Sequence, residues 1–343
     1  MSLPINLIFL LIVFYYTKMD SFKQQMEDYS FPLYESRKIT LQNKIGSGGT
    51  GTVYLGTLNL GTLHKKECVV KKVSSTDYDE HHKNRMMYQD IIDEVDIGHR
   101  FIGKATNLIQ FYGYSTFQKD GNDIIYLIME KTNAKNDVWD YLNSSKFWNS
   151  LSKREFDTSI SNTKMYNQCS GYREYWDYIL PKVDKLSLMK EVCKAVQELH
   201  SFKVVHCDLK LNNMVYTGSS IKLIDFGAST FIGKDKLHSG SVGLGTPGYM
   251  AKEMYDGWIS YKGDIYSLGV CMLEIWYGDI WPTDTGNYDT CRRYVLDYLI
   301  LLKKENPTLH SFIQRCVSTD PKKRPLIKTV IANLDRIHST CIY

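Results

Sequence analysis

A glycine-rich stretch in the first third of the chain has the spacing of a phosphate-binding loop. It reads Gly46-Ser47-Gly48-Gly49-Thr50-Gly51-Thr52-Val53, a G-x-G-x-x-G-x-V pattern. Glycines at these positions let backbone N–H groups approach phosphate oxygens without a Cβ atom in the way, and the valine can cover a planar base. The stretch lies between two strand-like segments rather than before a helix, which argues against a dinucleotide-binding turn.

A lysine and a carboxylate form the next candidate pair. Lys71 ends a strand-like C-V-V-K run, and Glu94 lies on the helical segment that follows. A lysine on a strand neutralises phosphate charge when a carboxylate aims its ammonium group. Asp90 and Asp93 are weaker rivals to Glu94. Lys72 competes with Lys71, but strand alternation places it on the opposite, solvent face.

Two acids and an amide follow in a characteristic order. The run His206-Cys207-Asp208-Leu209-Lys210-Leu211-Asn212-Asn213 precedes Asp225-Phe226-Gly227. This order, H-x-D-L-K-x-x-N and then D-F-G, resembles the protein kinase family. Three later motifs appear in the family's order: G-T-P-G-Y-M-A-K-E from Gly245 to Glu253, Asp264 in D-I-Y-S-L-G, and D-P-K-K-R-P with Arg324. The resemblance covers roughly residues 39–335 and rests on the whole set.

The resemblance implies an α+β, two-lobed protein kinase fold. The small lobe would be an antiparallel β-sheet with one key helix, and the larger lobe would be mostly helical. The implied divisions are an N-terminal extension (1–38) with a short apolar segment, a kinase domain (39–335) and a C-terminal tail (336–343). Within the domain we expect a small lobe at about 39–129, a hinge at about 130–136, a large lobe at about 137–335 and an insertion at about 147–180.

Hydrophobic periodicity predicts the elements that must position these residues. Alternation from Ile39 to Val73 predicts antiparallel strands, and two further strands are expected at 108–117 and 124–129. Helical stripes predict helices near residues 82–97, 186–200, 265–277 and 309–316.

The family's catalytic roles transfer position by position. Asp208 would accept or orient the proton of the substrate hydroxyl, and Lys210 would contact the γ-phosphoryl group. Lys71, aimed by Glu94, would neutralise the α- and β-phosphates. Magnesium would be held by Asn213 and Asp225, and the buried pair Glu253 and Arg324 would brace the large lobe.

The resemblance also implies how ATP is held. Met129 would guard the back of the pocket, the backbone of Glu130 to Thr132 would bond adenine, and Asp137 would meet the ribose. The implied ATP-binding set is Ile45, Gly46, Ser47, Gly48, Gly49, Thr50, Gly51, Thr52, Val53, Val69, Lys71, Met129, Glu130, Thr132, Asp137 and Val215.

Two positions depart from the family pattern. Cys207 replaces the arginine that normally receives an activation-loop phosphate. Gly98, four residues after Glu94, stands where the family places a large apolar side chain, so we expect a gap and a weakened helix there. Such a helix could need a regulatory partner to seat Glu94.

The first departure predicts that activity depends little on loop phosphorylation. Ser239 and Ser241 are the candidate phosphorylation sites. Replacing both with alanine should leave the rate of phosphate transfer nearly unchanged, because no arginine precedes Asp208 to bind a loop phosphate. A transfer assay that shows a large loss would contradict this prediction.

The implied activity is transfer of the ATP γ-phosphoryl group, with Mg²⁺, to Ser or Thr hydroxyls of protein substrates. Lys210 and the G-T-P-G-Y run, with Thr246 near Asp208, favour serine and threonine over tyrosine. A dual-specificity or tyrosine kinase stays an alternative. So does a catalytically weak or pseudokinase scaffold, against which the presence of every chemical residue argues.

Composition agrees with a single intracellular two-lobed unit. The chain has 343 residues, of which 43% are hydrophobic and 23% charged. A net charge of +4 with scattered basic residues gives no indication of nucleic-acid binding. Eight cysteines without a C-x-x-C pair indicate a reduced, cytoplasmic protein.

Residues 3–16 form a nearly continuous apolar segment. It is shorter than the ~20 residues of a membrane-spanning helix, and it lacks the flanks of a secretory signal. Two interpretations stay open. The segment is a weak membrane anchor that leaves the kinase domain in the cytoplasm, or it has no function and Met19 is the true start.

Overall fold

The computed structural model describes residues 22–28, 30–48, 51–61, 64–77, 83–132, 138, 184–233, 236–238, 244–281 and 287–340. The chain divides into two compact units, Met1–Asn133 and Ala134–Tyr343. The division falls within the range expected for a hinge. The expected insertion at 147–180 and the apolar segment at 3–16 lie outside the described residues.

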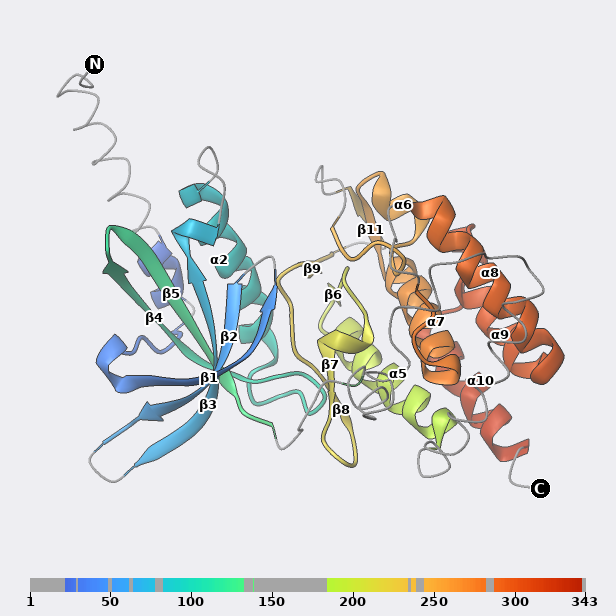
Figure 1. Ribbon diagram of the computed structural model, residues 1–343, viewed down its shortest axis with the longest axis horizontal. Coiled ribbons are helices and arrows are strands. Elements are labelled where there is room, and N and C mark those ends of the chain that lie inside the picture. Colours follow the sequence, from blue (N-terminus) through green and yellow to red (C-terminus); the bar gives the residue numbers. More distant parts are fainter. Residues whose placement is uncertain are drawn as a thin grey trace, which may run out of the picture. The chain divides into compact units, whose positions relative to one another are not determined.

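Unit 1 contains a five-stranded antiparallel sheet with the order β1-β2-β3-β5-β4 (Figure 1). The strands are β1 (Ile39–Gly48), β2 (Gly51–Asn59), β3 (Lys65–Ser74), β4 (Phe111–Lys119) and β5 (Asn122–Glu130). Alternating apolar residues cover one face, where Ile39, Leu58, Cys68, Val70 and Ile128 form a buried cluster. The sequence had predicted these strands to within a few residues.

One long helix, α2 (Lys83–Phe101), accompanies the sheet of unit 1 (Figure 1). Its apolar side chains Ile91, Val95 and Phe101 are buried, as is Glu94 between them. The short 3-10 turn η2 (Ser75–Asp77) follows β3. Because α2 follows β3 closely in sequence and packs beside β4, it can carry a carboxylate back to the β3 lysine.

The gap expected beside Gly98 is not present. The ring of Phe111, at the start of β4, fills the space that a side chain at position 98 would occupy. A Cβ atom added at Gly98 would lie 2.4 Å from Phe111 Cδ2 and 2.6 Å from Cε2. The expectation was wrong because sequence alone does not reveal that a neighbouring strand supplies the bulk.

Replacing Gly98 with alanine should therefore destabilise the chain by about 1–3 kcal/mol, the usual cost of overpacking, although alanine favours helix. The additional substitution Phe111→Leu should recover part of the loss, because a smaller side chain makes room for the new methyl group. The measurement is the free energy of unfolding in urea for both single variants and the double variant.

Gly61→Ala is the matched control, since a Cβ atom there would meet nothing within 4 Å. Strictly additive effects of Gly98→Ala and Phe111→Leu would show that the two side chains do not share this space.

Residues 22–38 belong to the packed part of unit 1 rather than to a separate extension. Residues 22–28 are helical, and the 3-10 turn η1 (Ser36–Lys38) leads into β1. Between them, Leu33 forms a parallel bridge with Tyr114 of β4, which is an edge strand of the sheet. Composition did not predict this contact.

Unit 2 is mostly helical, as expected. Its helices are α5 (Lys185–Ser201), α6 (Lys252–Tyr255), α7 (Tyr261–Tyr277), α8 (Tyr288–Glu305), α9 (Pro307–Cys316) and α10 (Ile327–Thr340). The helix α7, labelled in Figure 1, is buried from Gly263 to Ile275. Asp184, Asn287 and Asn306 cap the N-termini of α5, α8 and α9 by accepting backbone N–H bonds.

Short strand pairs and turns connect the helices of unit 2. β6 (Val204–Val205) pairs with β9 (Thr230–Phe231), β7 (Met214–Tyr216) with β8 (Ile221–Leu223), and β10 (Lys236–His238) with β11 (Trp258–Ser260). The 3-10 turns η4 (Leu211–Asn213) and η5 (Pro321–Lys323) complete the described elements. Asp208 lies in the segment between β6 and β7, and Asp225 lies in the segment between β8 and β9.

Several of the described helices differ from the sequence expectations. The helices α6, α8 and α10 and the helix at residues 22–28 had not been predicted. The helix α10 runs to Thr340, so residues 336–340, expected as part of a tail, belong to the last helix. Among the helices that the structure describes, none is long and apolar enough to span a membrane.

Candidate active site

In unit 1 the structure pairs Lys71 with Glu94. Lys71 Nζ on β3 lies 2.8 Å from Glu94 Oε2 on α2, and the two side chains are 6% and 3% exposed. Burying two charges is tolerated only when they are closely paired. The rival Asp93 instead accepts a hydrogen bond from Gln89 at the surface. Lys72, on the other face of β3, is half-buried rather than fully exposed.

Strand register brings the residues expected to hold ATP onto one face of the sheet. Val53 of β2 lies opposite Lys71, and Val69 lies opposite Met129 of β5. Since Val69 and Lys71 are two residues apart, all four side chains share a face. The side chain of Ile45, on β1, is half exposed.

Part of the backbone that follows Met129 already makes hydrogen bonds within the protein. The Glu130 N–H donates to the Gln110 carbonyl oxygen at 2.8 Å, and Glu130 Oε2 accepts from the Gln110 N–H at 3.1 Å. The Glu130 N–H is therefore not the group that an adenine base would use. Thr132 is described, whereas Gly49, Thr50 and Asp137 lie outside the described residues.

The glycine-rich stretch forms the hairpin between β1 and β2, with Gly48 opposite Gly51. Gly51 has φ +139°, and a Cβ atom there would lie 2.6 Å from the Lys72 carbonyl oxygen. A glycine is thus required for β3 to approach. A Cβ atom at Gly46 would meet nothing within 4 Å, so the backbone there is open to an incoming phosphate.

In unit 2 three side chains converge on Asp208. The Thr246 hydroxyl donates to Asp208 Oδ1 at 2.7 Å, and Lys210 Nζ lies 3.0 Å from Oδ2. Lys210 Nζ also donates to Thr246 Oγ1 at 2.7 Å. Asn213 Nδ2 donates to Asp208 Oδ2 at 3.0 Å and to its backbone oxygen at 2.8 Å. These donors fix the direction in which the carboxylate points.

The backbone before Asp208 is anchored from the central helix α7. The buried Asp264 accepts from the His206 N–H at 2.9 Å and from the Cys207 N–H at 3.1 Å. His200 Nε2 lies 2.8 Å from Asp264 Oδ2. Cys207 has φ +66°, a left-handed conformation that these bonds hold in place. The D-I-Y-S-L-G motif had marked Asp264, but the participation of His200 was missed because no local pattern indicates it.

The side chains of Cys207 and His206 are both buried, and burial favours the neutral form of each. Burial raises the pKa of the Cys207 thiol well above its usual value, and it lowers the pKa of His206 despite the nearby carboxylates. The His206 ring also contacts Phe226, with ring centroids 5.7 Å apart. A cysteine has no cationic form, so position 207 offers no positive charge to a phosphate; the small effect expected for loop phosphorylation stays a prediction.

Asn213 and Asp225 are linked through the β7–β8 hairpin. The Ile224 N–H donates to the Asn213 carbonyl oxygen at 3.1 Å, which places Asp225 one residue farther on, and Asp225 Oδ1 accepts from the Gly227 N–H at 3.1 Å. Within the described residues no group of three or more His, Cys, Asp or Glu side chains could enclose a metal ion. One carboxylate and one amide oxygen fit Mg²⁺ that completes its shell with phosphate and water oxygens. Val215 lies on β7 beside this pair and is half-buried.

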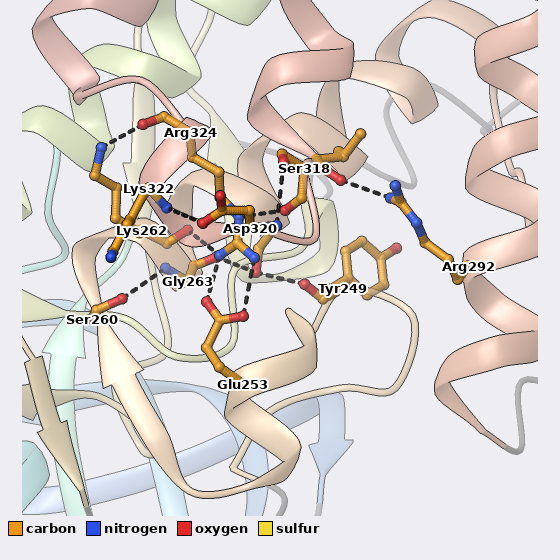
Figure 2. A network of polar contacts seen from close by, with 12 residues as sticks. Tyr249, Glu253, Ser260, Lys262, Gly263, Arg292, Ser318, Asp320, Lys322 and Arg324 are labelled. Atoms are coloured by element: carbon orange, nitrogen blue, oxygen red, sulfur yellow. Dashed lines mark hydrogen bonds and ion pairs between the residues drawn. The ribbon is translucent and has the colours of Figure 1, made fainter.

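Figure 2 shows the ion pair that braces unit 2. Arg324 Nη2 donates to Glu253 Oε2 at 3.0 Å, and Nη1 donates to Oε1. The buried guanidinium also donates to the backbone oxygens of Ser318, at 2.7 Å, and Lys262, at 2.9 Å. It lies over the ring of Tyr266, with Cζ 5.2 Å from the centroid. This network ties α6, the start of α7 and the turn η5 together, as the sequence had predicted for the pair.

A second buried acid, Glu274 on α7, supports the segment after Thr246. Its Oε1 accepts from the Tyr249 hydroxyl at 2.7 Å. Burial raises the pKa of Glu274 to about 8; the Tyr249 hydroxyl and the Trp281 indole counter the rise, and the charge of Asp279 adds to it. Nothing in the residues around Glu274 distinguishes it from a surface glutamate, so the sequence did not predict its role.

The raised pKa of Glu274 predicts a pH-dependent stability. Between about pH 5 and pH 8 the folded chain keeps a proton that the unfolded chain releases, so the stabilisation is complete at low pH and is lost as pH rises through the folded value. We expect Glu274→Gln, which stays neutral but can accept from Tyr249, to flatten this fall. Unfolding free energies of both proteins across the pH range check it, and parallel curves would contradict it.

The comparisons with known proteins agree with this geometry. A family model described as Protein kinase domain matches residues 39–334. The chain therefore belongs to the protein kinase family, and the expected α+β kinase fold is confirmed, with an antiparallel sheet in one unit and helices in the other.

Named relatives are serine/threonine kinases. The chain is 32% identical over 173 residues to Serine/threonine-protein kinase Wnk of Drosophila melanogaster, covering 48% of the chain and 7% of the relative. It is 27% identical over 275 residues to Probable serine/threonine-protein kinase 2 of Plasmodium falciparum, covering 78% of the chain and 43% of the relative. It is 28% identical over 199 residues to Serine/threonine-protein kinase WNK of Caenorhabditis elegans, covering 54% and 10%. The chain thus spans less than half the length of these relatives.

Proposed function

We propose that this kinase transfers the γ-phosphoryl group of ATP, with Mg²⁺, to serine and threonine hydroxyls of protein substrates. The observation that carries the proposal is the arrangement of Lys210, Thr246 and Asp208, in which a lysine and a small aliphatic hydroxyl meet one carboxylate within 3.0 Å. Such a carboxylate is suited to accept or orient the proton of an attacking hydroxyl.

The side chains of unit 2 divide the work. Asp208 directs the substrate hydroxyl, and Lys210 offsets negative charge on the transferred group. The Thr246 hydroxyl already lies 2.7 Å from Asp208 Oδ1, so little room is left beside the carboxylate. This favours a serine or threonine hydroxyl over the longer, planar tyrosine side chain.

The side chains of unit 1 hold the nucleotide in this proposal. Lys71 neutralises the α- and β-phosphates, with Glu94 fixing its position at 2.8 Å. The face formed by Val53, Val69 and Met129 contacts the base. Asn213 and Asp225 would hold Mg²⁺, which would offset the negative charge of the phosphates.

A reducing compartment and a protein substrate fit the remaining features. The described cysteines are all buried, and no disulfide joins any two of them: Cys68, Cys193, Cys207, Cys271, Cys291 and Cys316. Disulfides do not stabilise the described part of the chain, which supports a location in the reducing cytoplasm. A net charge of +4 favours neither nucleic acid nor a strongly acidic partner.

The test is transfer from γ-labelled ATP, with magnesium, to a mixed protein substrate, followed by phosphoamino-acid analysis. Label on serine and threonine supports the proposal, and label on tyrosine would assign dual or tyrosine specificity instead. Lys71→Met supplies the background, since it removes the charge that holds the phosphates. Absence of transfer by the unaltered chain, with ATP still bound, would favour a scaffold.

A further inference from the structure

Residues 22–28 and 30–34, which we call the N-terminal clasp, are built into the core of unit 1. The clasp begins with the helix at residues 22–28, and after a turn at Ser30, which has φ +51°, it reaches the edge of the sheet. Its side chains Phe22, Met26 and Phe31 are almost completely buried. Burial of three large apolar side chains ahead of the family-matched region indicates a specific seat rather than a loose extension.

The clasp contacts α2 directly. The Phe22 ring lies 5.2 Å from the ring of Tyr88, on α2. The Tyr88 hydroxyl in turn donates to Asp123 Oδ2 on β5 at 2.8 Å, and both residues are buried. Tyr88 thus joins the clasp, the helix and the sheet, on the same helix that carries Glu94.

The clasp also covers the free edge of β4. The Tyr34 N–H donates to the Tyr114 carbonyl oxygen at 2.8 Å, and the Tyr114 N–H donates to the Pro32 carbonyl oxygen at 2.9 Å. The Tyr114 ring meets Phe22 edge-on at 5.8 Å and stacks on Phe31 at 6.0 Å. Backbone pairing satisfies the strand edge, while the aromatic contacts fix the register.

Gly113 shows that β4 is adapted to the clasp. It has φ +151°, and a Cβ atom there would lie 2.4 Å from the Pro32 carbonyl oxygen and 2.5 Å from the Tyr34 ring. Any side chain at position 113 would displace the clasp backbone. This observation is independent of the apolar side chains of the clasp itself.

We propose that the N-terminal clasp is an intramolecular positioning element that holds α2 against the sheet and so keeps Glu94 on Lys71. The proposal rests on the proposed function and adds the regulation of that same site. Gly98 weakens α2 on its own, and a helix that lacks full intrinsic stability depends on tertiary contacts to stay formed. The regulatory partner expected from Gly98 is, on this view, the chain's own N-terminal segment.

The test uses the full chain with Phe22→Ala and Phe31→Ala together. Hydrogen exchange should show the amides of α2 losing protection by roughly tenfold or more, while those of α5 and α7 in unit 2 keep theirs. The kcat/KM for ATP should fall in proportion to the fraction of molecules in which Glu94 stays on Lys71, about tenfold when that fraction drops to about a tenth.

Gln25→Ala with Leu33→Ala is the matched control. Both side chains belong to the clasp but are exposed, Leu33 by 54%. This variant should keep both α2 protection and kcat/KM within about twofold of the unaltered chain, since surface changes have small effects.

Rescue in trans separates positioning from general damage. A synthetic peptide with the sequence of residues 22–36 is added to the Phe22→Ala, Phe31→Ala chain. It should restore part of the α2 protection and of kcat/KM, whereas the same peptide with both phenylalanines replaced by alanine should not.

Two results would overturn the proposal. In the first, the double variant keeps α2 protection and kcat/KM. In the second, the strands β1, β2 and β3 lose protection together with α2 and no peptide rescues, which would make the clasp an ordinary part of the core. If the unaltered chain transfers no phosphate, the proposed function fails, but the exchange and rescue measurements still decide whether the clasp holds α2.

Discussion

Replacing Asp208 with asparagine should lower kcat by about 10²–10⁴-fold, the range for removing a positioned general base, with little change in ATP binding. Asparagine keeps the shape and can still accept from Thr246 through its amide oxygen. It cannot take a proton, and its NH₂ group would face the donors of Lys210 and Asn213, which now meet Asp208 Oδ2 at 3.0 Å each. The proposed function assigns nucleotide binding to Lys71 and the sheet of unit 1, not to Asp208.

Steady-state transfer from γ-labelled ATP, alongside direct measurement of ATP binding, separates these effects. Asp256→Asn is the matched control, because it makes the same chemical change at an exposed acid of unit 2. A kcat that stays within about threefold for Asp208→Asn would remove Asp208 from the role of proton acceptor.

Arg324→Ala is expected to cost about 3–5 kcal/mol of unfolding free energy, the usual cost of breaking a buried ion pair by removing one partner. The substitution leaves Glu253 without its bidentate partner and removes donors from the backbone oxygens of Ser318 and Lys262. Arg324→Lys should lose less but still destabilise, since an ammonium group cannot reproduce the planar fork.

Urea unfolding followed by far-ultraviolet circular dichroism measures the loss. The double variant Glu253→Gln, Arg324→Met should be more stable than Arg324→Ala, because it leaves no unpaired charge. Arg336→Ala, at an exposed position of α10, is the control and should change stability by less than about 0.5 kcal/mol. A loss of that size for Arg324→Ala would show that the network in Figure 2 does not brace unit 2.

Much of the fold was predictable because its signals are local. Strand alternation placed Lys71 and Val69 on one face of β3 and Lys72 on the other. The strand register shows that Val53 and Met129 lie on the same face as Lys71 and Val69. Helical periodicity predicted α2, α5, α7 and α9 to within a few residues at most ends. The assignment of catalytic and ATP-binding roles to these residues stays a prediction.

Strand alternation and helical periodicity did not predict contacts between segments that are distant in the sequence. The expected gap at Gly98 was wrong because Phe111 comes from another element. Asp264 holds the loop before Asp208 from more than fifty residues farther along the chain, and His200 contacts Asp264, which nothing in the local pattern of His200 indicates. The helix α10, which continues to Thr340, had not been predicted, because the family motifs stop before it.

By itself, then, the sequence determined the family and the order of the chemical groups, since the motif residues are constrained by the chemistry of phosphate and appear in a set sequence. Only the tertiary structure decided which groups are buried together. It packed Phe111 against Gly98, brought His200 to Asp264, and seated the N-terminal clasp on β4 and α2. A side chain is buried or paired only when segments far apart in the chain pack together. The free energy that burial and pairing cost or gain therefore depends on that packing.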